Sequence, residues 1–197
     1  MPPTRRYEAE EQGHGRPDRQ LWLRTRFPDE AQVAKVFAVA AFFCYGWTLI
    51  AFFRSLTVNW MLFMEPGEIV GVLSYLLVSD FFEAALVTSV LALLAALLPR
   101  QVLRTRFAAR GPILVASLLG SIMLYMRFFE IRELDTSGFR WLLMFMGIGL
   151  PLVALVRLSS KVERFIVLAA DRCVVLLYLF LPLSAAGLLI VVVRNLT

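Results

Sequence analysis

Long apolar runs are the feature that most constrains the fold of this chain. Stretches of about 20 apolar residues recur along its 197 residues, and each can cross a hydrocarbon layer of about 30 Å. Hydrophobic residues make up 59% of the chain and charged residues 18%, against about 45–50% and about 25% in soluble domains. The sequence predicts an all-α integral membrane protein. It excludes a soluble enzyme, a disordered chain and a disulfide-stapled secreted domain.

Five transmembrane helices in a bundle are predicted from these runs and from the charges and prolines that bound them. Asp29 is placed to cap the first helix, and Pro112 to occupy the first turn of the third, where proline is tolerated. Pro182 is expected to kink the last helix. The predicted spans are 33–53, 69–98, 112–129, 141–156 and 165–193.

The first 28 residues differ in composition from the rest of the chain. Six arginines alternate there with acidic residues, glycines and prolines, and no apolar period appears. Such a segment cannot bury enough apolar surface to fold alone. Residues 1–28 are therefore predicted to form a polar, disordered cytoplasmic leader, and residues 29–197 to form the membrane domain.

Basic residues are distributed unevenly between the two sides of the predicted bundle. Fourteen of the 20 Lys and Arg residues lie in the leader, at the start of the first span, or in segments 100–110 and 157–164. Short loops rich in Lys and Arg stay cytoplasmic, so the amino terminus is predicted inside and the carboxyl terminus outside. These basic segments are expected to contact anionic lipid head groups of the bilayer, and their position beside the spans argues against nucleic acid as a partner.

Two acidic residues, Asp80 and Glu83, interrupt the second predicted span. They are three residues apart and so lie on one side of a helix. Carboxylates within a membrane usually face a bundle interior or water, which makes this pair a candidate polar site. If the hydrocarbon region begins at Ser79, both carboxylates are interfacial. If the whole run 69–98 is embedded, Glu83 is central and the helix tilts by about 48°.

Two further groups of residues are candidate sites. Asp171 and Arg172 belong either to a solvated extension of the last span or to a partly buried ion-pair network with Asp80 or Glu83. In the fourth span, a glycine and proline cluster predicts either a simple kink or a break that frames a substrate site. The cluster consists of Gly147, Gly149 and Pro151.

Small residues at helical spacing predict where the spans pack closely. In the second span they are Ala85, Ser89, Ala92 and Ala96, which share one stripe of a helix. With one histidine and two cysteines in the chain, neither a metal site nor a cofactor is predicted. Cys44 and Cys173 fall within apolar runs and are expected to be small buried side chains.

Two function classes remain open from the sequence. The chain carries no P-loop, zinc-protease, nucleophile-elbow or dinucleotide-binding motif, and its spans carry several small-residue stripes. These observations favour a non-catalytic accessory, assembly or scaffold subunit of a membrane complex, with other membrane subunits as partners. The alternative is a small transporter, flippase or lipid-modifying protein that uses Asp80 and Glu83 in a polar pocket.

The predicted orientation can be tested with introduced cysteines. A membrane-impermeant thiol reagent applied to intact cells should label a cysteine in place of Asp135 and spare one in place of Thr105. The reason is that the loop at 99–111 is predicted to be cytoplasmic and the loop around Asp135 external. The opposite labelling pattern would overturn the span count or the orientation.

Overall fold

Four long helices make up most of the part of the chain that the structure describes. The structure is a computed structural model, and it describes residues 28–56, 60, 63–98, 107–128, 140, 143, 147, 151 and 159–196. The helices are α2 (Glu30–Ser55), α4 (Pro66–Leu97), α5 (Phe107–Phe128) and α8 (Ser160–Leu196). All four are long and apolar enough to cross a membrane, so the described residues confirm the predicted all-α fold and are consistent with an integral membrane protein.

The predicted count of five spans is not confirmed. Four of the predicted spans correspond to α2, α4, α5 and α8. The fourth, at residues 141–156, lies outside the described residues apart from Leu143, Gly147 and Pro151. The predicted leader also lies outside them, except for Pro28.

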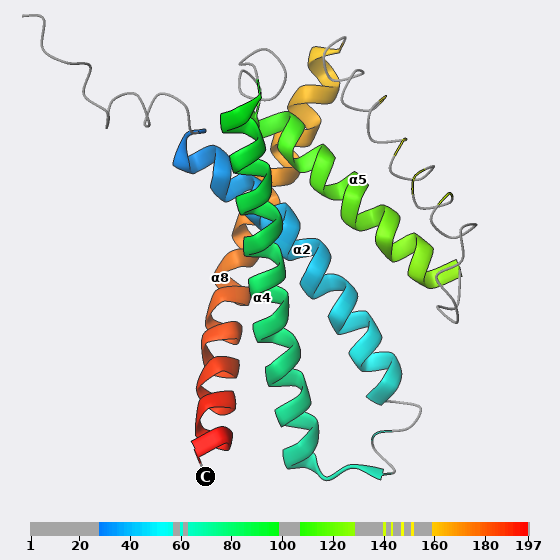
Figure 1. Ribbon diagram of the computed structural model, residues 1–197, viewed down its shortest axis with the longest axis vertical. Coiled ribbons are helices and arrows are strands. Elements are labelled where there is room, and N and C mark those ends of the chain that lie inside the picture. The colour runs from blue at the N-terminus through cyan, green and yellow to red at the C-terminus, as the bar shows by residue number, and fades with distance from the viewer. Residues whose placement is uncertain are drawn as a thin grey trace, which may run out of the picture.

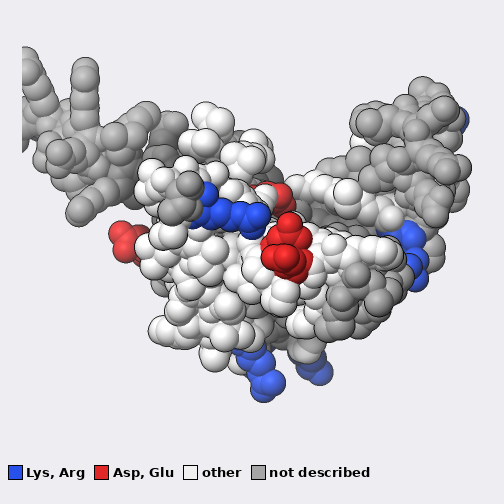
Figure 2. Space-filling model, turned by 90° about the horizontal axis from the view of Figure 1, so that it is seen from below, with Lys and Arg blue, Asp and Glu red and all other residues white. Residues whose placement is uncertain are grey.

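α2 packs against each of the other three described helices (Figure 1). α4 and α8 run side by side in opposite directions, and α2 crosses obliquely against both. α5 packs mainly on α2 and diverges from α8 along its length. Seen from the end where α4 begins and α8 ends, charged side chains form a few patches on a largely uncharged surface (Figure 2).

Local sequence explains where α2 and α4 begin. Asp29 has extended backbone, and its carbonyl accepts the first helical bonds of α2, although its side chain makes no cap. At α4, Glu65 and Glu68 form a reciprocal capping box around Pro66, which occupies a first-turn position. α4 therefore starts three residues before the predicted boundary. This box supplies the starting signal that the apolar pattern alone does not contain.

The expected position of Pro112 is wrong. The third span was predicted to begin at this proline, but α5 begins at Phe107 and includes Pro112 in its second turn. The extra turn is held by packing, because Phe107 is fully buried and Gly111 lies directly against the side chain of Val36 on α2. Tertiary contact at the start of α5 thus outweighs the helical hydrogen bond that Pro112 cannot donate.

α4 and α8 approach each other closely at Ser74 and Gly187. A Cβ atom placed on Gly187 would lie 3.1 Å from the carbonyl oxygen of Ser74 and 3.4 Å from its Cα. Farther toward the ends of the pair, the side chain of Arg194 lies against Gly71, in space that a side chain at that position would occupy. Small residues therefore let the two backbones meet, as is typical of membrane helices.

The buried stripe of α4 differs from the predicted one. The structure leaves Ser89 exposed and Ala85, Ala92 and Ala96 only half-buried. The buried positions lie one residue earlier in the sequence, because α2 and α8 both pack on that side of α4. They are Gly71, Ser74, Leu77, Asp80, Ala84, Thr88, Leu91 and Ala95.

Candidate functional site

Asp80 is buried where α4 meets α2. Only 4% of its surface is exposed. Its Oδ1 accepts a hydrogen bond of 2.7 Å from Oγ1 of Thr48 on α2. Its Oδ2 is also buried and has no hydrogen-bond partner among the described residues. A buried carboxyl with one unsatisfied oxygen is costly in a membrane, which is why such groups are candidates for function.

The pairing of α4 with α8 fixes the depth of Asp80 in the bundle. Ser74 lies against Gly187, and Oγ of Ser184 donates to the carbonyl of Leu77 at 3.3 Å. In this antiparallel register Asp80 lies level with Leu181. That position is well inside the apolar stretch of α8 between Arg172 and Arg194, which is about 30 Å long at 1.5 Å per residue. The register argues against an interfacial Asp80, but the α4 residues level with this stretch are 68–88 and not the whole run 69–98 of the embedded alternative.

Further hydroxyl groups lie near this crossing, and the sequence analysis did not identify them. Tyr45 on α2 is hydrogen-bonded to Ser184 on α8, and its ring stacks on Phe180 with centroids 4.5 Å apart. Since Ser184 donates to Leu77, the Tyr45 hydroxyl is the donor in the first bond. Tyr45 and Thr48 are three residues apart on α2, a spacing that could have identified this polar face.

Glu83 lies in a different environment from Asp80. It is exposed on the surface of α4, and its Oε1 accepts a hydrogen bond of 3.2 Å from Oγ of Ser79. Positions three residues apart on a helix differ by about 60° in direction, and the edge of the α2 contact falls between them. The two carboxylates that were predicted to act as a pair are therefore one inside the bundle and one on its surface.

Asp171 forms an ion pair with Lys35 on α2, away from the acidic residues of α4. Its Oδ1 lies 2.7 Å from Nζ of Lys35, and both side chains are partly exposed. Arg172 is exposed. In the α4–α8 register, Asp171 is level with Val90, well away from Asp80 and Glu83. Within the described residues, the structure thus brings neither Asp80 nor Glu83 into the Lys35–Asp171 ion pair.

The glycine and proline cluster of the fourth predicted span is described only in part. Gly147 and Pro151 have helical backbone and Pro151 is exposed, whereas Gly149 lies outside the described residues. The break predicted at this cluster therefore stays a prediction.

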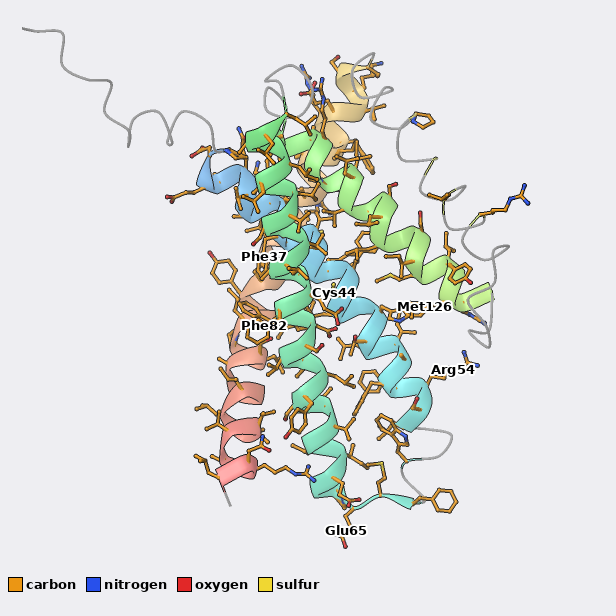
Figure 3. All side chains as sticks on the ribbon, viewed as in Figure 1. Phe37, Cys44, Arg54, Glu65, Phe82 and Met126 are labelled. Atoms are coloured by element: carbon orange, nitrogen blue, oxygen red, sulfur yellow. The ribbon has the colours of Figure 1, made fainter. Side chains whose placement is uncertain are left out.

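An apolar groove of about 260 Å³ lies between α4 and α8. Phe82 on α4 is one of the residues that line this groove, whereas Cys44 lies where α2 passes α4 (Figure 3). Ser184 is the polar residue of the lining, and its hydroxyl already bonds to Tyr45 and Leu77. The lining residues are Val78, Phe81, Phe82, Leu181, Ser184, Ala185 and Leu188.

The described residues offer little for metal chemistry. In this part of the chain, no three His, Cys, Asp or Glu side chains are grouped closely enough to hold a metal ion. Cys44 is buried, Cys173 is half-buried, and both are free thiols. Asp80 and Glu83, the carboxyl groups in the apolar part of α4, are accordingly the residues that carry the functional proposals.

Comparisons with known proteins do not assign the chain to a family. No family model matches it, and neither the search of curated proteins nor the search of solved structures gave a match. The geometry of the helices is therefore the basis for a functional assignment.

The Thr48–Asp80 hydrogen bond should contribute measurably to stability. Thr48→Val removes the described donor to Asp80, so the free energy of unfolding in detergent should fall by about 1–3 kcal/mol. Thr88→Val is the matched control: among the described residues the Thr88 hydroxyl donates to the carbonyl of Ala84 in its own helix, and its loss should cost less. Equal destabilisation by the two variants in thermal unfolding would contradict a special role for the bond to Asp80.

Proposed function

We propose that this chain is an assembly subunit of a membrane complex, and that it binds another membrane-spanning helix through the exposed face of α4. The observation that carries the proposal is Glu83, a carboxyl group on the surface of an apolar helix. Lipid tails offer such a group no hydrogen bond. A membrane-embedded carboxyl group on an outer face is stabilised when a polar group of another chain covers it.

The surroundings of Glu83 fit a helix-binding face. Phe82, Leu86 and Val90 are large, apolar and exposed on the same helix. They form a surface that is compatible both with lipid and with the side of another helix. In such a surface, van der Waals packing supplies contact area and a polar group supplies specificity.

The described helices support a fifth crossing of the membrane. Ala109 and Ile113 near the start of α5 pack against residues in the first turns of α8, including Val162 and Ile166. α5 runs away from that end, so the chain must return to it before α8 begins. A span at 141–156, as the sequence predicts, would accomplish this return.

The same arrangement supports a cytoplasmic amino terminus and an external carboxyl terminus. α2, α5 and α8 all begin at one end of the bundle, which carries Lys35, Arg110, Lys161 and Arg164. At the other end, basic residues occur singly in the last turns of these three helices, and α4 begins with two glutamates. A basic excess at the first end is the cytoplasmic signature.

A second candidate function is a small transporter that uses Asp80 alone. The observation that favours it is the buried Oδ2 of Asp80, which has no hydrogen-bond partner among the described residues and is free to take a proton or cation. Glu83 would have no role in that mechanism, because it lies on the surface. The two candidates thus differ in the carboxyl group they require.

The assembly proposal is tested by purification in a gentle detergent with native mass measurement. The wild-type chain should be recovered in a complex, and Glu83→Leu should dissociate it, since the variant removes the polar contact while preserving an apolar surface. Ser89→Leu is the control, because Ser89 is also exposed on α4 but is not ionisable. Asp80→Asn should leave the complex intact.

Two results would contradict the proposal. One is recovery of the wild-type chain as a strict monomer with no co-purifying chain. The other is a complex that survives Glu83→Leu but is lost in Asp80→Asn, which would transfer the role to the buried carboxyl group.

A further inference from the structure

A second polar group lies on the surface of the bundle, on α8. Tyr178 is 81% exposed and lies six residues after Arg172, within the apolar stretch of this helix. Its hydroxyl can donate and accept a hydrogen bond. Tyrosine is favoured at membrane interfaces, where the hydroxyl meets water, so an exposed Tyr178 within the apolar stretch needs a polar partner.

Tyr178 and Glu83 lie at the same depth. Leu77 on α4 is level with Ser184 on α8, as the hydrogen bond between them shows. Glu83 is six residues after Leu77, and Tyr178 is six residues before Ser184. Because the two helices are antiparallel, moving from Leu77 to Glu83 and moving from Ser184 to Tyr178 both shift the position by about 9 Å toward the same end of the bundle, at 1.5 Å per residue.

The chemistry of the two positions is complementary. The Tyr178 hydroxyl is a donor, and the Glu83 carboxylate is an acceptor. α8 also offers an acceptor beside the tyrosine ring. Pro182 has no N–H, so the carbonyl of Tyr178 lacks the donor that a helix normally provides at this spacing. A protonated Glu83 could donate to that carbonyl.

We infer that the partner of the α4 face is a second copy of this chain, with Glu83 of one copy hydrogen-bonded to Tyr178 of the other. This inference rests on the proposed function and names its partner. Copies inserted with the same orientation hold every residue at a common depth. A group on α4 of one copy therefore meets the group on α8 of another copy that is level with it.

The residues one turn farther along fit the same contact. Leu86 on α4 and Val175 on α8 are again level with each other, and they are 65% and 66% exposed. On the other side of Tyr178, the exposed residues Ala185 and Ala186 offer small side chains against which a helix can pack closely. An apolar strip thus continues on both sides of the polar pair.

The contact joins two different surfaces of the chain. It is therefore heterologous, and it leaves the α8 face of one copy and the α4 face of the other open to further copies. Closure of such contacts about an axis normal to the membrane gives a ring.

The test measures association by energy transfer between labelled copies in lipid vesicles, as the protein-to-lipid ratio is varied. Tyr178→Phe and Glu83→Leu should each weaken association about 3- to 10-fold, the range of hydrogen bonds between membrane helices. The double variant should lose little more than either single variant, because both remove one interaction. Tyr75→Phe is the matched control: it removes an exposed hydroxyl whose partner is Asn195 of the same chain, so association should be unchanged.

Cross-linking tests the geometry while the polar pair is kept. In a background without Cys44 and Cys173, copies carrying Leu86→Cys are mixed with copies carrying Val175→Cys. A disulfide-linked product of the two different copies is expected. Products linked only through identical positions would overturn the heterologous contact.

The outcomes separate this inference from the function on which it rests. If a different chain co-purifies in a Glu83-dependent manner and the labelled copies do not associate, the second copy is the wrong partner and the assembly function stands. Self-association that is unchanged by Tyr178→Phe also overturns the inference. A strict monomer with no co-purifying chain overturns both.

Discussion

The backbone contact between Ser74 and Gly187 is the constraint on which the rest of the arrangement depends. A Cβ on Gly187 would lie only 3.1 Å from the Ser74 carbonyl, so a side chain there would require the backbone of α4 to shift by a few tenths of an ångström. The contact and the adjacent Ser184–Leu77 hydrogen bond fix the register of the two longest helices. That register sets the depth of Asp80 and Glu83 relative to the apolar stretch of α8. It also brings Ser184 to Tyr45, so that α2 is held in the same polar network.

This geometry places two carboxyl groups of one helix in opposite environments, Asp80 inside the bundle and Glu83 on its surface. A carboxylate at the centre of a membrane helix costs about 2.5–3.5 kcal/mol for Asp on insertion scales. Thr48 offsets part of this cost for Asp80, whose other oxygen stays without a described partner. Among the described residues, Glu83 accepts a longer hydrogen bond from Ser79, and it is exposed. The bundle therefore buries Asp80 and leaves Glu83 on its surface, where we propose that a partner binds. Tyr178 on α8 is level with Glu83.

Much of the fold could be predicted from the sequence, because membrane spans depend mainly on apolar length. The spans at α2 and α4 agree within three residues, whereas α5 and α8 each begin five residues before the predicted start. At α5 the burial of Phe107 extends the helix beyond Pro112. Sequence spacing identified Asp80 and Glu83 but could not show that one is buried and the other exposed. The two side chains differ by about 60° in direction around the helix, and the positions of the neighbouring helices decide which of them is covered. The stripe predicted at Ala85, Ser89, Ala92 and Ala96 was displaced by one residue for the same reason. Tyr45, Thr48 and Ser184 were missed because their pairing spans three helices.

The most direct test of this account compares the reactivity of the two carboxyl groups from within the bilayer. A lipid-soluble carbodiimide, which forms an N-acylurea with carboxylic acids, is applied to the protein in vesicles at high lipid-to-protein ratio, where copies are separated. Peptide mass analysis should find Glu83 modified and Asp80 protected, because Glu83 is exposed on α4 whereas Asp80 is 4% exposed. Modification of Asp80 as fast as Glu83 would show that both carboxyl groups are reached from the lipid, and would contradict the division of roles on α4.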